Sequence, residues 1–346
     1  MPPSRRRREA CLTAAWRRRG AAAVALLPLA GLFALLAALR RAAYASGLVR
    51  THRAGVPVVV VGNLLAGGVG KTPLVIHLCR ELAARGRHPG VISRGHGGAT
   101  GDAPLAVGAQ TPAAICGDEP LLIRRRTGVP VFVGRDRVAA AQALVAAHRE
   151  VDVIISDDGL QHLALARDME IVVFDARGDM NGWLLPAGPL REGIGRVARV
   201  DAVVGNGCAV PPRLCFGRPL FRMDLQAGAF VRLHDGEALP PADWRTRHAG
   251  LRVHAFAGIG TPQRFFDTLA ALGIDAVPHV FDDHHAYVAA DLAFDADVLL
   301  TTEKDAVKFS ALALPPTPIW VLPVDAVVSP DLVALVLEKL DGRPSA

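Results

Sequence analysis

Cysteine, lysine and aromatic residues are scarce in this chain of 346 residues. It holds five cysteines and four lysines, the latter against 35 arginines, and aromatic residues make up 5% of it. The cysteines are odd in number and show no CxxC spacing, which argues against a disulfide framework or a zinc site and fits a reducing compartment. Charged residues are 21% and apolar residues 51% of the chain. This balance excludes a disordered or fibrous protein.

The formal net charge of +6 is unevenly distributed. Residues 1–53 carry eleven arginines and one acid, Glu9, and are therefore +10; the remaining 28 bases and 32 acids give −4. A body of negative charge argues against nucleic acid as a partner. The basic tail beside an apolar run favours an anionic membrane surface instead.

A run of twenty uncharged residues extends from Gly20 to Leu39 between arginines at 17–19 and 40–41. As a helix it would be about 30 Å long, the thickness of a bilayer's hydrocarbon core. Three interpretations compete: a spanning or deeply embedded anchor, a helix lying in the interface, or a signal peptide cleaved near residues 43–45. The arginines just before that cleavage site and the nucleotide motif downstream argue against cleavage.

The orientation of this run poses a conflict. Seven arginines precede it and four follow it by Arg53, so the positive-inside rule places the N-terminus in the cytoplasm. A single span would then put the body on the side that lacks nucleotide. Either the charge rule does not hold here or the helix is embedded without crossing.

Strand and helix patterns alternate along the body. Residues 56–61 (VPVVVV) are typical of a buried parallel strand, and residues 73–85 have helical periodicity. Further strands are predicted at 90–93, 129–133, 151–156, 170–174 and 200–204, with a helix at 136–147. This order predicts a doubly wound α/β domain.

A hairpin pattern then interrupts the alternation. Residues 230–233 and 237–239 flank His234-Asp235-Gly236, and Asp-Gly between such segments indicates a tight turn. The α/β pattern resumes at 252–257 and continues to 319–324. We therefore predict a basic tail and membrane anchor helix (1–45), a P-loop kinase domain (46–220), a β-hairpin linker (221–250) and a second, smaller α/β domain (251–346).

The strongest motif is GNLLAGGVGKTP at residues 62–73. It follows a predicted strand and opens a helix, as a P-loop requires. Backbone N–H groups of Gly67, Gly68, Val69 and Gly70 would wrap the phosphates of ATP, Lys71 would reach the β- and γ-phosphates, and Thr72 would hold Mg²⁺. Residue 65 should be glycine in the strict pattern and is leucine, but the GGxGKT core is intact.

A second motif lies about 85 residues downstream, where the apolar strand 153–156 ends in Asp157 and Asp158. In P-loop enzymes such a strand end supplies the carboxylate that organises Mg²⁺. The residues that follow, Gln161 and His162 among them, extend this strand end toward the site.

Further strings occur in a characteristic order: SRGHG at 93–97, GDEP at 117–120, DDGLQH at 157–162, PAGPLRE at 186–192, FAGIG at 256–260, DH at 283–284 and TEKD at 302–305. Over residues 46–335 the chain closely resembles the tetraacyldisaccharide 4′-kinases, the lipid A kinases of Gram-negative bacteria. The resemblance implies ATP- and Mg²⁺-dependent phosphorylation of the 4′-hydroxyl of a tetraacyldisaccharide 1-phosphate, giving lipid IVA in lipid A (lipopolysaccharide) biosynthesis. It also implies two α/β/α domains with a hairpin linker, and an anchor at the cytoplasmic face of the inner membrane.

The resemblance also assigns catalytic residues. From the residues alone, Asp118 would be an exposed turn aspartate and His284 part of a solvated polar turn or a weak metal ligand; the resemblance makes Asp118 the catalytic base and His284 its assistant, with His285 as the alternative. Glu119 would lie beside the Mg²⁺. Family members typically carry tyrosine where this chain has His96.

Other residues are matched to the substrates. Arg137 and Arg191 correspond to basic residues that neutralise phosphate charge, a role that suits the planar fork of arginine. Asn206 and His162 are further candidates for contact with the substrate.

The TEKD segment allows two interpretations. Lys304 and Asp305 could read a purine, or they could be the solvated start of a helix with Asp305 near its N-cap. Both stay open.

Two rival functions share a similar loop. ParA- or MinD-like ATPase switches carry a lysine just before the double glycine, where this chain has Ala66. GTP-dependent metallochaperones need a Cys/His cluster near the loop, and none is present in the sequence. No obligate protein partner is evident, and the kinase interpretation is the one we carry forward.

Overall fold

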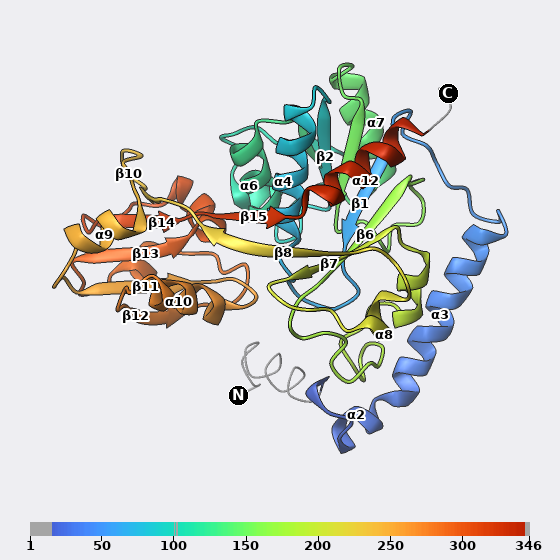
Figure 1. Cartoon of the computed structure of the whole chain (residues 1–346), viewed down its shortest axis with the longest axis horizontal. Helices are drawn as coiled ribbons and strands as arrows, with labels where there is room; N and C mark the ends of the chain where they lie inside the picture. The colour runs from blue at the N-terminus through green and yellow to red at the C-terminus, as the bar shows by residue number, and fades with distance from the viewer. Residues whose placement is uncertain (1–15, 100, 102, 343–346) are drawn as a thin grey trace.

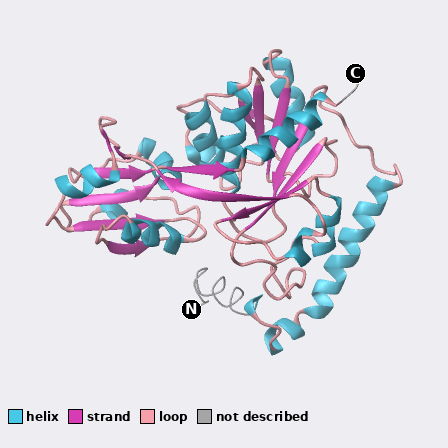
Figure 2. Ribbon diagram, viewed as in Figure 1, coloured by secondary structure: helices cyan, strands magenta, loops and turns pink. Residues whose placement is uncertain are grey.

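The computed structural model describes residues 16–99, 101 and 103–342, and it consists of two sheets with helices around each (Figures 1 and 2). The arginines at 5–8 and Cys11, which belong to the predicted basic tail, lie outside the described residues. The α/β class predicted from the sequence is confirmed.

The first sheet has nine strands in the order β15-β8-β7-β6-β1-β5-β2-β4-β3. The strands from β8 to β4 are parallel to one another, while β15 and β3 are antiparallel edge strands. Its strands are β1 (Val58–Gly62), β2 (Pro89–Ser93), β3 (Leu105–Ala106), β4 (Val131–Val133), β5 (Val153–Asp157), β6 (Met169–Phe174), β7 (Ala202–Asn206), β8 (Leu220–Ala227) and β15 (Val324–Val328). The central strands are buried throughout because helices cover both faces, which explains their uninterrupted apolar runs.

Helices around this sheet follow local signals. In α7 the side chain of Asp136 caps the first turn by accepting from the backbone N–H groups of Val138 and Ala139. Helix α6 ends at Gly128, which adopts the left-handed conformation that favours glycine. The elements are α4 (Lys71–Ala84), α5 (Ala113–Cys116), α6 (Asp118–Thr127), α7 (Arg137–Ala147), η1 (Ile194–Arg199), α8 (Pro212–Cys215) and α12 (Pro330–Asp341).

The second sheet has six strands in the order β10-β9-β14-β13-β11-β12. Its strands are β9 (Phe230–Arg232), β10 (Ala238–Leu239), β11 (Val253–Ala257), β12 (Val277–Val280), β13 (Val298–Thr302) and β14 (Ile319–Leu322), and its helices are α9 (Pro241–Arg247), α10 (Pro262–Ala271), η2 (Ala289–Leu292), α11 (Glu303–Ala306) and η3 (Val307–Ala311). The predicted hairpin forms between β9 and β10, but β9 also pairs with β14. The hairpin is therefore an edge of the second sheet and not a separate linker.

Two long strands join the sheets instead. The chain leaves the first sheet through β8 and returns through its antiparallel partner β15 (Figure 1). Helix α12 then packs on the first sheet, where Leu332 and Val336 lie in the same apolar core as β1 and α4. The predicted domain of residues 251–346 is thus wrong at its end, because Ala326, Val328 and the apolar face of α12 lie in the core of the first domain.

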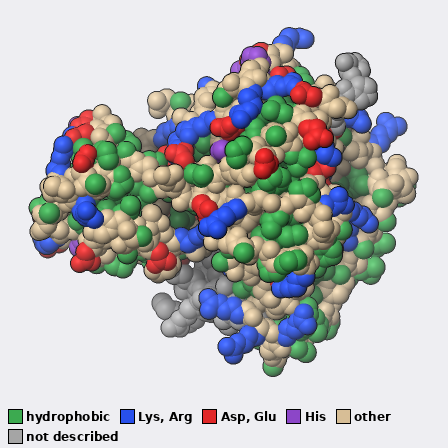
Figure 3. Space-filling view, in the orientation of Figure 1, with side chains coloured by type: hydrophobic (Ala, Val, Ile, Leu, Met, Phe, Trp, Pro, Cys, Tyr) green, Lys and Arg blue, Asp and Glu red, His purple; other side chains and the backbone are tan. Residues whose placement is uncertain are grey.

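The apolar N-terminal run forms two helices, α2 (Ala21–Ala25) and α3 (Leu27–Ala45), in place of one continuous helix. The break falls just before Pro28, which has no N–H to continue the hydrogen-bond ladder. Helix α3 is about 29 Å long, includes Arg40 and Arg41, and is the one described helix long and apolar enough to cross a membrane. It runs along the edge of the first domain, and basic side chains gather near α2 at its lower end (Figures 1 and 3).

Candidate active site

The P-loop connects β1 to α4 at the centre of the first sheet, as its position in the sequence predicts. Gly70 has a φ of +84°, and a Cβ there would lie 2.2 Å from the amide nitrogen of Asn206, so the loop requires glycine at this point. The side chain of Asn206 is buried and donates a hydrogen bond to the carbonyl of Val69 (2.8 Å). Asn206 therefore supports the loop from a buried position, and its predicted contact with the substrate stays a prediction.

Leu65, the departure from the strict P-loop pattern, has a packing explanation. It is fully buried and forms a β-bridge with Leu190 of the PAGPLRE segment. Backbone hydrogen bonds from Arg191 N to Leu64 O (2.7 Å) and from Ala66 N to Pro189 O (2.8 Å) complete this contact. A glycine at 65 would leave a void against this segment.

The cations and carboxylates of the two predicted motifs lie together. Lys71 Nζ is 3.5 Å from Asp158 and 3.3 Å from the side-chain oxygen of Asn63. Arg191 makes a bidentate pair with Asp158, each N–O distance being 3.0 Å. Burial alone would raise the pKa of Asp158, but Lys71 and Arg191 outweigh it and hold that pKa well below its usual range. Asp158 is thus an ionised partner of two cations.

Asp157 has a different environment. Its side chain is buried and neither carboxylate oxygen has a hydrogen-bond partner among the described residues. Burial, reinforced by the charge of Glu119, raises the pKa of this carboxyl. An unpaired buried carboxylate is costly unless it meets a cation, so Asp157, with Thr72 beside Lys71, fits a Mg²⁺ site. No group of three His, Cys, Asp or Glu among the described residues forms a protein cage for a metal, and Mg²⁺ is normally held by one or two carboxylates together with substrate phosphates.

Asp118 begins helix α6 and is 4% exposed. Gly117 before it has a φ of +90°, and a Cβ there would lie 2.7 Å from the carbonyl of His96, which fixes glycine at this tight entry. The Nδ1 atom of His284, from the second domain, lies 3.1 and 3.0 Å from the two carboxylate oxygens of Asp118. The structure thus brings together two residues 166 positions apart in the sequence.

Electrostatics favour an ionised Asp118. Burial alone would raise its pKa, but the hydrogen bond with His284 and the charges of Lys304 and Lys308 lower that pKa to about 2. Burial lowers the pKa of His284, yet the hydrogen bond and the charge of Asp118 leave it above the usual value. His285 instead contacts Asp291 (2.9 Å), so His284 is the histidine that reaches Asp118.

The TEKD segment joins the two domains at this point. Lys304 Nζ lies 3.0 Å from Glu119 and 3.4 Å from Asp283. Asp305 is fully buried, accepting from Gly258 N (3.0 Å) and from the hydroxyl of Thr302 (2.8 Å). Asp305 is therefore structural, and Lys304 pairs with Glu119, the predicted neighbour of Mg²⁺.

A cleft of about 490 Å³ separates the P-loop from the second domain. Residues 68–73 and Glu119 line one side; Gly260, Thr261, the start of α10 and the 302–304 segment line the other. The P-loop, Glu119 and Lys304 therefore border one cavity, with space for phosphates.

Two further predicted residues, Arg137 and His162, are not among the residues that line this cleft. Arg137 is 3% exposed. Its guanidinium lies 3.4 Å from the carbonyl of Asp157 and 3.5 Å from that of Asp158, so it places a positive charge at the end of β5. Burial, together with the charge of Arg137, lowers the pKa of His162 to about 4. His162 is therefore neutral near pH 7.

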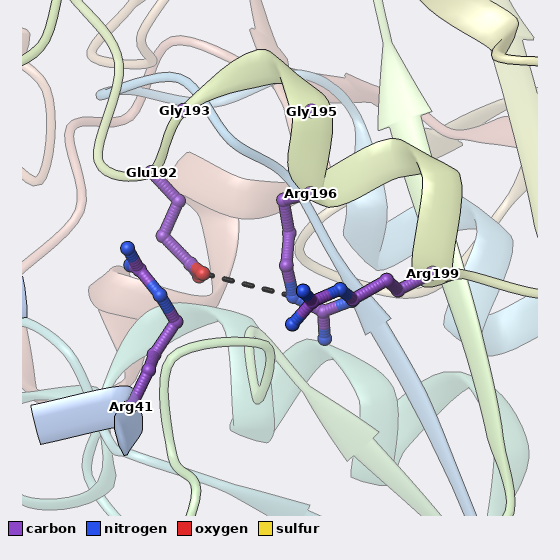
Figure 4. A pocket seen from close by; sticks show the side chains of 6 residues that line it. All are labelled: Arg41, Glu192, Gly193, Gly195, Arg196 and Arg199. Carbon is purple, nitrogen blue, oxygen red and sulfur yellow. Dashed lines mark ion pairs between the residues drawn. The ribbon is translucent and has the colours of Figure 1, made fainter. Parts of the chain in front are cut away.

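A smaller pocket of about 270 Å³ lies where α3 meets η1 (Figure 4). Arg41 from α3 and Arg196 and Arg199 from η1 line it together with Glu192, which pairs with Arg196 at 3.6 Å. Glu192 directly follows Arg191, the partner of Asp158, so one short segment contacts both this pocket and the end of β5.

Comparisons with known proteins identify the family. The model of the family described as tetraacyldisaccharide-1-P 4′-kinase matches residues 22–341. The chain belongs to this family. The tetraacyldisaccharide 4′-kinases of Azoarcus sp. and Dechloromonas aromatica are 52% and 51% identical to it over 335 and 332 residues, covering 96% and 95% of this chain and 96% of each relative. A crystal structure of LpxK from Aquifex aeolicus in complex with ATP superposes with a TM-score of 0.74 at 28% identity, over 92% of this chain and 99% of that one. The resemblance deduced from the motifs is confirmed.

Two side chains at the site, Lys308 and Asn63, escaped the sequence analysis, and a third, His96, was noted there without a role. Lys308 lies 3.7 Å from Asp118 and 2.9 Å from Asp305; the scarcity of lysine, and its position one helical turn after Lys304, could have marked it. Asn63 contacts both Lys71 and Arg191, directly after β1. His96 packs edge-on against His284, with ring centroids 5.1 Å apart, so its position serves as an aromatic support.

Proposed function

We propose that the protein transfers the γ-phosphoryl group of ATP to the 4′-hydroxyl of a tetraacyldisaccharide 1-phosphate, a step of lipid A biosynthesis. One observation carries this assignment: in a member of this family of kinases, the P-loop lines a cleft together with Glu119 and Lys304, and Lys304 Nζ lies 4.0 Å from Asp118, which pairs with His284 of the other domain. A switch ATPase needs no general base for a sugar hydroxyl, whereas a kinase benefits from one.

Different residues bind the phosphates, accept the proton and hold Mg²⁺ in the proposed reaction. Lys71 and the loop N–H groups hold the β- and γ-phosphates in line with the acceptor, and positioning of this kind supplies most of the catalysis in phosphoryl transfer. Asp118 accepts the proton of the 4′-hydroxyl while His284 orients it. Thr72 and Asp157 would hold Mg²⁺, which when bound neutralises charge on the phosphates.

The acceptor approaches from the side of α3. Arg41 and Arg199 present cations in the pocket beside this apolar helix, which suits the anionic head group of a lipid. Cytosolic ATP and the exposed apolar face of α3 support a location at the cytoplasmic face of the inner membrane, with the anionic membrane surface as a partner.

A direct assay tests the proposal. The purified protein is incubated with γ-labelled ATP and disaccharide 1-phosphate lipid, and the lipid is examined for label on the 4′-oxygen. Label on the lipid, absent when the acceptor lacks a free 4′-hydroxyl, is the expected result. ATP consumption that is the same with and without lipid would contradict the kinase and favour an ATPase switch.

A further inference from the structure

The short segment before α2, residues 16–19, is attached to the loop that carries Arg191. The indole Nε1 of Trp16 donates to the carbonyl of Pro186 (2.9 Å), and the carbonyl of Trp16 accepts from Asn181 N (3.1 Å). The Nε of Arg19 donates to the carbonyl of Asn181 (3.0 Å), and its guanidinium lies 5.4 Å from the ring centroid of Trp183. Four polar and cation–π contacts thus converge on residues 181–186.

The loop of residues 181–192 transmits this attachment to the phosphate site. The buried side chain of Asn181 donates to Ala187 O (2.9 Å) and accepts from Trp183 N (3.0 Å). Backbone bonds from Gly188 N to Leu184 O (2.9 Å) and from Leu190 N to Trp183 O (3.1 Å) close the loop. Its far end is bonded to residues 64–66 of the P-loop and bears Arg191 on Asp158, as described above.

We propose that Trp16 and Arg19 are positioning residues for phosphoryl transfer, holding the 181–192 loop so that Arg191 and the start of the P-loop keep their geometry. This inference rests on the proposed function. The same segment leads directly into α2 and α3, so the anchor is mechanically linked to the site. The segment would then have a role beyond membrane attachment. Loss of its contacts with residues 181–186 should lower turnover even in detergent, where no membrane is present.

The test separates positioning from attachment by using non-ionic detergent micelles. Arg19→Ala and the double variant Trp16→Phe/Arg19→Ala are compared with Arg18→Ala, which removes the same charge from an exposed neighbour. Trp16→Phe keeps an aromatic ring and loses the N–H donor. Because small misplacements of reacting groups reduce rates steeply, we expect kcat of the double variant to fall about tenfold or more relative to Arg18→Ala.

Two further readouts accompany the rate. The KM for ATP should change less than twofold, and the backbone amides of Leu185, Gly188 and Leu190 should exchange with deuterium faster than in Arg18→Ala. Arg19→Lys, which keeps a cation over Trp183, should recover most of the lost turnover. Arg19→Ala, the double variant and Arg18→Ala, which carry the same net charge, should be recovered with membranes equally.

The outcomes are distinguishable from those of the kinase assay. If the double variant turns over like Arg18→Ala, the positioning role is refuted while the kinase assignment stands. If the unmodified protein labels no lipid, the proposed function itself fails. Unchanged deuterium exchange in the loop alongside lower turnover would also refute the inference, because the loss would then have another origin.

Discussion

Asp118 and His284 form a hydrogen-bonded ion pair that is shielded from water, with side chains 4% and 22% exposed. Ion pairs in such a setting are strongly directional, and removing one partner leaves the other with an unfavourable environment. Two lysines, Lys304 and Lys308, add positive charge within 4.0 Å of the carboxylate. In the proposed reaction, a sugar hydroxyl would therefore meet an ionised and oriented, though weakly basic, acceptor for its proton.

Substitution of this pair should reveal one functional unit. Asp118→Ala should lose about 10²-fold or more in kcat with little change in MgATP affinity, because a positioned base contributes about 10²–10⁴-fold. His284→Ala should lose less, since it acts through Asp118. The double variant should be about as slow as Asp118→Ala, because residues acting together are non-additive.

Steady-state kinetics of the three variants, with nucleotide binding measured separately, checks this prediction. His285→Ala is the matched control, since its partner is Asp291. Multiplicative losses in the double variant would mean that the two residues act independently. Loss of Mg²⁺ binding in Asp118→Ala would instead make this residue a metal ligand.

Contacts between residues that are distant in the sequence could not be predicted from the sequence alone. Asp118 and His284 were named through family resemblance, because a turn aspartate and a polar turn carry no local signal that they meet. The same limit applies to Lys304, whose pairing with Glu119 depends on how two domains face each other. The choice between His284 and His285 likewise needed the geometry of the turn after β12.

At the scale of elements, the local sequence was sufficient to predict the strand, the turn and the helix around the P-loop. The run of valines, the glycine-rich turn and the amphipathic segment after it predicted β1, the P-loop and α4 with ends displaced by one or two residues. These signals lie within one strand, one turn and one helix, so no distant contact is needed to read them. Leu65 and Asn206 are the exceptions, since each is explained by a distant segment packed on the loop.

We expect the function of the P-loop to depend on Lys71. Lys71→Ala should abolish phosphoryl transfer while leaving the melting temperature within a few degrees, because Lys71 lies at the cleft rather than in the apolar core. The released Asp158 still has Arg191 as a partner, which limits the structural cost. Transfer of labelled phosphate and thermal unfolding check the two halves of this prediction.

A matched variant sharpens the interpretation. Lys339→Ala removes a lysine that pairs with Asp201 just before β7, at the opposite end of the parallel strands from the P-loop, and it should retain normal turnover. Near-normal turnover of Lys71→Ala would mean that the loop is not the ATP site.

At the scale of the whole molecule, the chain crosses between domains twice through β8 and β15. The sequence pattern was continuous from residue 252 to 324 and gave no sign that the last strand and α12 return to the first sheet. The return of the chain to the first domain is favoured because α12 buries Leu332, Val333 and Val336 against the core around α4. The two crossings place the cleft between the domains, so residues of both domains line it.

Helix α3 is the other feature of the whole molecule, and it has an apolar surface without a protein partner among the described residues. Five leucines of α3 are more than half exposed: Leu29, Leu32, Leu35, Leu36 and Leu39. Exposed apolar surface of this extent indicates contact with a membrane or another protein. The neighbouring arginines add about 1 kcal/mol each near an anionic surface, an attraction that salt screens.

Deletion of residues 1–45 should therefore reduce recovery with anionic vesicles and lower turnover on lipid embedded in them. A variant with Leu29, Leu32 and Leu36 changed to glutamine keeps every arginine and the 16–19 segment, and it should lose vesicle binding that resists high salt while keeping its turnover in detergent micelles. The deletion should lose turnover in both settings, because it also removes Trp16 and Arg19. Sedimentation with vesicles at low and high salt measures the two contributions separately. If the leucine variant still sediments at high salt like the unmodified chain, then the exposed face of α3 is not the surface that enters the membrane.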